Sequence, residues 1–165
     1  MQDEIGRVRH IIEEHTVIRE RSKAVGDEIN DLEAGEDLKL LSDSFSGTDE
    51  VVLADRLKQL KQALSFLFEG LRKHYEEEEE LFLGILGEPL TRALTHEHRQ
   101  ITEDITSLIA VGDNTGLFPI SQQRSPAVMM HIFQRIGAIR KMIEEHTRRE
   151  DVVLQMLLAG LQEEQ

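Results

Sequence analysis

The chain has 165 residues, a net charge of −13 and no cysteine, and these three facts already exclude several classes of protein. Strong negative charge argues against a nucleic-acid partner or an anionic membrane surface, because both repel an acidic protein. Without cysteine there are no disulfides, thiolate zinc sites, iron–sulfur ligands or cysteine nucleophiles. The length suits one domain with a sizeable core, so we expect a single domain over residues 1–165.

The sequence has no segment with the features of a secretion signal or a membrane span. The N-terminal sequence MQDEIGRVRH is charged and amphipathic, unlike a signal peptide. No uninterrupted apolar run approaches the roughly 20 residues that a helix needs to cross a bilayer. We therefore expect a soluble cytoplasmic protein with no membrane partner.

The first half of the chain contains two long segments with the apolar periodicity of an α-helix. The first runs over about residues 3–33 and fades at an Ala-Gly-Glu-Asp sequence. A polar segment rich in serine follows, and Thr48 is a candidate N-cap for the second helix. That helix extends to about Leu86, where Gly87 and Pro89 supply a stop signal.

The second half of the chain contains two more such segments. The third helix covers about residues 89–111 and ends at a Gly-Asp-Asn sequence. Ser125 and Pro126 match an N-cap followed by proline at the first helical position, so the fourth helix opens there and extends to about residue 158. Nothing alternates with a period of two for long enough to be a strand. The prediction is an all-α, up-down antiparallel four-helix bundle.

Six ionisable residues stand on the apolar faces of these helices, where leucine or isoleucine is expected. In the second helix, leucines recur in steps of three and four, and the next members of that series are His74 and Glu78. In the first helix, Ile12 and Ile18 flank His15 in the same way. Burying unpartnered charges is very costly, so such groups either compensate one another or bind a cation, and we favour the cation. The full set is His15, His74, Glu78, His98, His146 and Glu150.

The spacing of these residues favours a centre with two metal ions. In each His-x-x-x-Glu sequence the two side chains lie one helical turn apart on the same face. A carboxylate has two oxygens and can bridge two cations, whereas a structural zinc site would close with four ligands and leave two of the six groups unused. The mixed nitrogen and oxygen donors suit iron, with manganese and zinc as alternatives.

The order of the six residues also indicates an internal duplication. The first and third helices each carry one lone histidine preceded by glutamate, and the second and fourth each carry one His-x-x-x-Glu sequence. We therefore expect two helical hairpins packed around a pseudo-two-fold axis, with the site lying on that axis.

This pattern resembles the hemerythrin-like, HHE cation-binding domain family over essentially the whole chain. The resemblance implies a four-helix bundle that holds two non-heme iron ions bridged by an oxo or hydroxo group. It further implies that Glu78 and Glu150 are the bridging carboxylates. The set differs from that of the oxygen-carrying hemerythrins, which have a fifth histidine. The terminal ligands implied by the resemblance are His15, His74, His98 and His146.

The resemblance implies a protein that binds or reacts with O₂, NO or peroxide, for sensing, storage or stress protection. A small di-iron redox enzyme, acting as an oxidase, a peroxidase or an NO-reducing catalyst, is an alternative. An iron-handling or iron-centre repair protein is another. The sequence leaves open whether the protein is an enzyme.

Helix geometry separates the six residues from neighbours of the same types. His96 precedes His98 by two residues, about 200° around the helix, and should face solvent. Among the five consecutive glutamates at residues 76–80, only Glu78 falls on the apolar face. We expect the other four glutamates to form a solvated surface.

Four residues directly beside the predicted ligands have roles that the sequence leaves open. Glu14, Glu97 and Glu145 each precede a predicted histidine ligand. Each is a candidate to accept the outward N–H of a neighbouring imidazole, although a solvated helix surface is an equally good interpretation. Tyr75 follows His74. A phenol there could hydrogen-bond a ligand of the metal, but about 100° of helix rotation separates the two residues, and we expect Tyr75 to lie at a helix interface.

Overall fold

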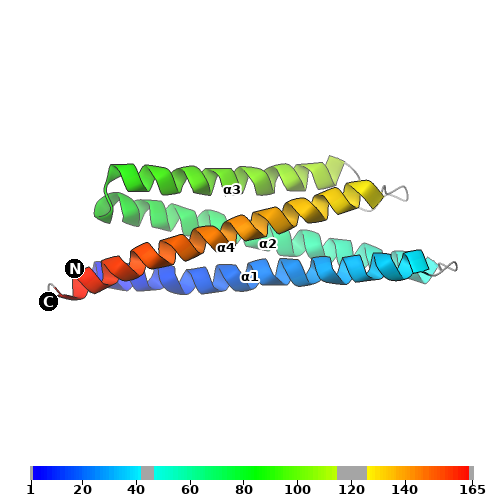
Figure 1. Cartoon of the computed structure of the whole chain (residues 1–165), viewed down its shortest axis with the longest axis horizontal. Helices are drawn as coiled ribbons and strands as arrows, with labels where there is room; N and C mark the ends of the chain where they lie inside the picture. The colour runs from blue at the N-terminus through cyan, green and yellow to red at the C-terminus, as the bar shows by residue number, and fades with distance from the viewer. Residues whose placement is uncertain (1, 42–46, 115–125, 164–165) are drawn as a thin grey trace.

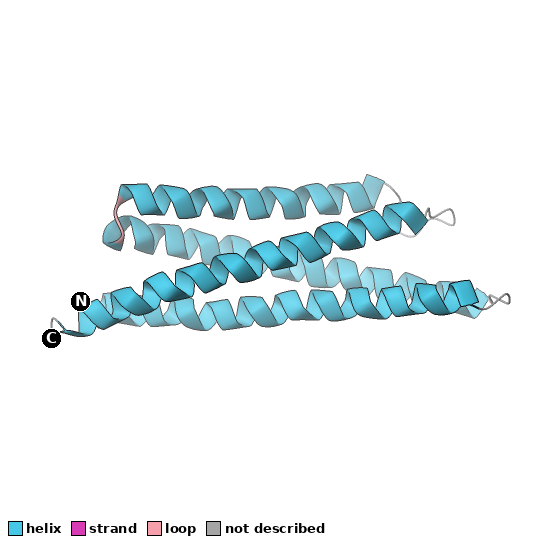
Figure 2. Ribbon diagram, viewed as in Figure 1, coloured by secondary structure: helices cyan, strands magenta, loops and turns pink. Residues whose placement is uncertain are grey.

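The computed structural model describes residues 2–41, 47–114 and 126–163, and every residue in these ranges except Leu86 and Gly87 is helical. Four helices and no strand make up this described part of the chain (Figure 1, Figure 2). The all-α prediction is confirmed. The bounds of the helices are Gln2–Leu41 for α1, Gly47–Ile85 for α2, Glu88–Asn114 for α3 and Pro126–Glu163 for α4.

The four helices form an antiparallel ring. Helix α1 packs against α2 and α4, and α3 packs against the same two helices, whereas the backbones of the diagonal pairs do not come within 8 Å (Cα to Cα) in the described ranges. Successive helices run in opposite directions, and both chain ends lie at the same end of the bundle (Figure 1). This is the predicted up-down four-helix bundle, and it turns one face of every helix toward a common interior.

The first helix is longer than predicted, and the second begins earlier. Helix α1 continues through residues 34–37 to Leu41, because one glycine costs a helix only about 1 kcal/mol and no proline interrupts this stretch. Helix α2 begins at Gly47, so Thr48 lies inside it and the predicted N-cap is wrong. The serine-rich residues 42–46 lie outside the described residues.

The second hairpin agrees more closely with its sequence signals. Helix α4 begins at Pro126, as the preference of proline for the first helical turn predicts. Ser125 and the predicted loop before it lie outside the described residues. Both α3 and α4 extend a few residues past their predicted ends, to Asn114 and Glu163.

The turn between α2 and α3 is made by Gly87, whose φ is +76°. The Leu86 amide donates to the Phe82 carbonyl at 2.8 Å, and the Thr91 amide and hydroxyl approach the Gly87 carbonyl at 3.2 and 3.0 Å. A left-handed residue after a helix is the usual place for glycine, so the predicted stop signal is confirmed.

Gly87→Ala should lower the free energy of unfolding by about 1–2 kcal/mol, because a Cβ is strained at a positive φ. Gly84→Ala is the matched control: Gly84 is helical and exposed, and a Cβ there meets nothing within 4 Å. That control should raise stability by about 0.5 kcal/mol, since alanine is the better helix former. Urea unfolding of both variants checks the prediction, and equal losses in the two would contradict it.

The apolar core consists of two clusters on either side of a polar layer. The larger cluster includes Ile18 and Leu71, and the smaller one, nearer the chain ends, includes Leu81. In α1 the buried residue on the far side of the layer is Ile11, which is 2 % exposed, whereas Ile12 is only partly buried. The other members of the predicted stripe in α1 are buried and Ile12 alone is misplaced, because steps of three and four residues along a helix fit Ile11 as well as Ile12. No helix within the described ranges is long and apolar enough to span a membrane.

Candidate metal centre

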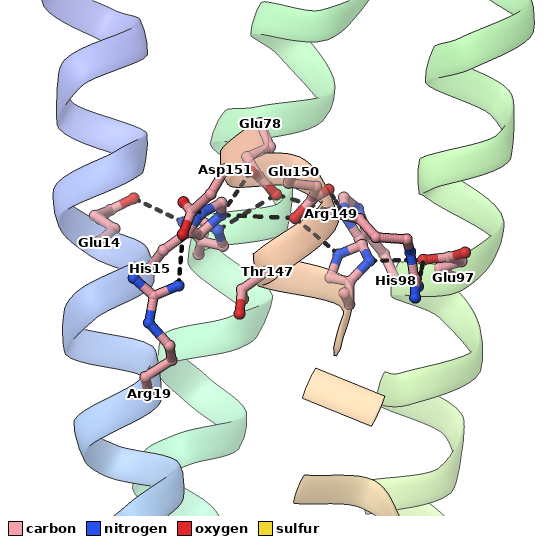
Figure 3. A network of polar contacts seen from close by, with 12 residues as sticks. Glu14, His15, Arg19, Glu78, Glu97, His98, Thr147, Arg149, Glu150 and Asp151 are labelled. Atoms are coloured by element: carbon pink, nitrogen blue, oxygen red, sulfur yellow. Dashed lines mark hydrogen bonds and ion pairs between the residues drawn. The ribbon is translucent and has the colours of Figure 1, made fainter. Parts of the chain in front are cut away.

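All six predicted ligands lie together in the polar layer between the two apolar clusters. Each of the four helices contributes at least one of them, and none is more than 2 % exposed. Figure 3 shows Glu78 and Glu150 at the middle of this layer, with His15 on the α1 side and His98 on the α3 side. His96 is exposed, so the helix geometry correctly distinguished it from buried His98.

Glu78 contacts histidines from three helices. Its Oε1 lies 3.1 Å from His15 Nε2, and its Oε2 lies 3.3 Å from His74 Nε2. The same Oε2 lies 3.4 Å from His98 Nε2. One carboxylate thus faces a pair of histidines on α1 and α2 and reaches across the bundle to α3.

Glu150 has the same relation to the other side of the layer. Its Oε1 lies 3.2 Å from His98 Nε2, and its Oε2 lies 3.0 Å from His146 Nε2. Glu150 Oε2 also lies 3.6 Å from His15 Nε2. Each carboxylate therefore contacts histidines of both pairs, as a bridging ligand must.

These distances follow the predicted pseudo-two-fold axis. Exchanging α1 with α3 and α2 with α4 relates three contacts of Glu78 to three contacts of Glu150. The distances to the lone histidine of the hairpin are 3.1 and 3.2 Å, those to the histidine one turn before the glutamate are 3.3 and 3.0 Å, and those across the bundle are 3.4 and 3.6 Å. The duplication inferred from ligand order thus appears in the geometry of the layer. The exchange maps His15 onto His98, His74 onto His146, and Glu78 onto Glu150.

Four nitrogen and oxygen atoms at the centre of the layer, each able to bind a metal, have no hydrogen-bond partner. They are His74 Nε2, Glu78 Oε2, His146 Nε2 and Glu150 Oε2. His146 Nε2 and Glu150 Oε2 are only 3.0 Å apart, yet their orientation is not that of a hydrogen bond. An unsatisfied buried polar atom costs about 1–3 kcal/mol, whereas a cation among these atoms would satisfy all four. The donor set therefore fits a metal.

Each of the four imidazoles in the layer is held from outside by a carboxylate on an adjacent helix, and Figure 3 shows three of these carboxylates, Glu14, Glu97 and Asp151. Because a carboxylate only accepts, each Nδ1–H must donate outward, which leaves Nε2 directed at the centre. Such outer partners fix the ring orientation of metal-binding histidines. The bonds join His15 to Asp151 at 2.6 Å, His74 to Glu14 at 2.9 Å, His98 to Glu79 at 3.0 Å and His146 to Glu97 at 2.8 Å.

The sequence identified half of these outer carboxylates. Glu14 and Glu97 accept from imidazoles, so the first of the two interpretations, an outer hydrogen-bond partner and not a solvated surface, holds for both. Glu145 does not: it is exposed and lies 3.7 Å from a lysine on its own helix. Glu79, which the sequence places on a solvated surface, accepts from His98, and Asp151, for which the sequence makes no prediction, accepts from His15. The missed signal is an acidic residue directly after each central glutamate, as in Glu78-Glu79 and Glu150-Asp151.

Two arginines extend the network toward the surface. Arg19 donates to Asp151 at 2.7 Å, and Arg149 donates to Glu97 at 2.6 Å. Burial tends to raise the pKa of Glu97, but Arg149 and His146 outweigh it and lower this pKa below its ordinary value. Glu97 is thereby held in its charged form, which is the form that accepts most strongly from an imidazole.

His74 and Glu78 hold each other in their charged forms. Burial lowers the pKa of His74, but Glu78 and Glu14 outweigh it and raise this pKa to about 9. Burial raises the pKa of Glu78, but His15 and His74 outweigh it and lower this pKa to about 2. A metal binds the neutral imidazole, so metal uptake at neutral pH releases protons from this layer.

Tyr75 lies at the interface of α2 with α3, as predicted, and also belongs to the polar layer. It is 4 % exposed, and its ring stacks on His98 with centroids 3.9 Å apart. Its hydroxyl is buried and has no hydrogen-bond partner. Burial and the nearby charges of Glu150 and Glu78 raise the pKa of Tyr75 well above its ordinary value, so the phenol keeps its proton.

Fold and site together define an all-helical bundle whose core holds a histidine and carboxylate cluster able to bind cations. A family model described as the hemerythrin HHE cation-binding domain matches residues 6–158, a range that includes all six central residues. The chain belongs to this family. No curated protein and no solved structure matches it.

Proposed function

We propose that the chain holds two non-heme iron ions, with Glu78 and Glu150 shared between them. The observation that carries the proposal is that each of these carboxylates contacts histidines of both pairs. Two groups of potential ligand atoms lie close together, one containing His15 and His74 and the other containing His98 and His146, and Glu78 belongs to both groups. We assign one iron to each pair of histidines.

The donor chemistry favours iron over the alternatives. Six donors exceed the four of a closed structural zinc site, and the four imidazole nitrogens are more than a manganese or magnesium site usually has. Two histidines and two shared carboxylates give each ion four protein donors. An octahedral ion would keep positions free for a small molecule.

We further propose that the protein binds or reacts with O₂, NO or peroxide in sensing, storage or stress protection. When bound, an iron pair supplies redox chemistry and the free positions that such molecules occupy. The chain itself supplies the enclosure: the apolar clusters above and below the layer exclude bulk water. The outer carboxylates hold the four imidazoles in the orientation that ligation needs.

Elemental analysis of protein produced in iron-replete medium and purified without chelators tests the proposal. We expect about two irons per chain, as the two histidine pairs require. The loaded protein should change its visible absorption spectrum on exposure to O₂ or NO. Folded protein with no iron would refute the centre, and one ion per chain, or zinc in place of iron, would refute the di-iron assignment.

A further inference from the structure

The pseudo-two-fold axis relates all six central residues but not the residues that follow His74 and His146. Those positions hold Tyr75 and Thr147, which are both buried. The Thr147 hydroxyl donates to the Glu144 carbonyl of its own helix at 3.3 Å. The Tyr75 hydroxyl has no such partner. The two halves of the layer therefore differ at this position, where α2 carries a buried phenol without a hydrogen-bond partner.

The ring of Tyr75 lies in the half that contains His98 and His146, although the residue itself is on α2. It is parallel to the His98 ring within 5°, and it meets the His146 ring edge-on with centroids 5.7 Å apart. The His74 ring of the other pair lies 5.8 Å from the phenol ring, so Tyr75 contacts both halves, but its stacked partner, at 3.9 Å, is His98.

The same half is approached by a pocket from the protein surface. This pocket lies between α3 and α4, has a volume of about 120 Å³, and is lined in part by Glu97, Ile101 and His146. A water molecule occupies about 30 Å³ of liquid, so the space suits a molecule of a few atoms and not a larger organic substrate. The pocket reaches the central layer at His146, the histidine that Tyr75 meets edge-on, and Tyr75 itself does not line it.

We propose that the small molecule binds in the half containing His98 and His146, and that the Tyr75 hydroxyl donates a hydrogen bond to it. A phenol hydroxyl has one O–H donor, and that of Tyr75 is buried without a partner. It therefore favours a molecule with an acceptor lone pair, such as a small anion or a polarised diatomic. This inference rests on the proposed di-iron function. It adds which half of the layer binds the small molecule and that Tyr75 determines which molecules bind there.

The test uses azide as the probe and the iron-loaded, oxidised protein as the receptor. Iron per chain is measured first in the wild type, in Tyr75→Phe and in the matched control Thr147→Val. Azide is then titrated while the visible absorption spectrum is recorded. We expect all three proteins to hold the same iron, and azide to bind Tyr75→Phe about 10-fold or more weakly, the effect of one hydrogen bond to a charged group. Thr147→Val should bind azide as the wild type does.

Each other result overturns the inference in a distinct way. Equal azide affinity in Tyr75→Phe and the wild type, with iron intact, removes the donor role and leaves the di-iron function standing. Loss of iron from Tyr75→Phe, or of a phenolate-to-iron absorption band, makes Tyr75 a metal ligand instead. If Thr147→Val weakens azide binding as much as Tyr75→Phe does, the small molecule has no preference for the half containing His98 and His146. A wild type without iron removes the proposed function and the inference together.

Discussion

Glu78→Gln and Glu150→Gln should each weaken iron binding by more than 100-fold and affect both ions at once. Glutamine keeps the size of the side chain but removes its charge and one of its two acceptor oxygens. Each carboxylate contacts histidines of both pairs, so neither iron position is left complete by the substitution. The loss should exceed the roughly 10–100-fold effect that is typical for the outer partners of a metal ligand.

The matched control for these variants is Glu76→Gln. Glu76 lies two residues before Glu78 on the same helix, but it is exposed and accepts from Arg72 at 2.8 Å. The measurement is iron retained per chain after dialysis against a graded series of chelator concentrations, with far-ultraviolet circular dichroism to check the helical fold. Retention of both irons by Glu78→Gln, or equal loss in Glu76→Gln, would refute the bridging role.

The fold and the central layer could be predicted because both depend on local helix geometry. A period of 3.6 residues places His74 and Glu78 on the same face as the leucines before them, whatever the rest of the chain does. The same rule distinguished His98 from His96. Four such faces can be buried together only in a bundle, so the convergence of the six side chains followed from the helices themselves.

The outer carboxylates and Tyr75 could not be assigned because their partners lie on other helices. Glu79 and Asp151 face imidazoles across a helix interface, and that depends on how far each helix is rotated against its neighbour. Glu145 satisfies the same local rule as Glu97 but points to solvent. A sequence fixes the period of a helix more firmly than its rotation within a bundle.

Asp151→Ala should weaken iron binding by about 10–100-fold, because it removes the outer hydrogen bond of one ligand. Asp151 accepts from His15 Nδ1 at 2.6 Å and from Arg19 at 2.7 Å, so it fixes the outer side of the imidazole whose Nε2 faces the two central carboxylates. The pseudo-two-fold axis maps Asp151 onto Glu79, which accepts from His98. Glu79→Ala should therefore weaken binding to a similar degree, although it lies within a run of five glutamates.

Glu145→Ala is the control that separates this geometry from the sequence pattern. Glu145 precedes His146 directly and was a candidate outer partner, whereas His146 in fact donates to Glu97. Competition against a chromogenic iron chelator gives the affinity of each variant, and Glu145→Ala should match the wild type. The reverse ranking, with Glu145→Ala impaired and Asp151→Ala intact, would mean that α4 is rotated from the position described here. A uniform small loss in all three variants would instead mean that surface charge, and not the orientation of the imidazoles, governs the affinity for iron.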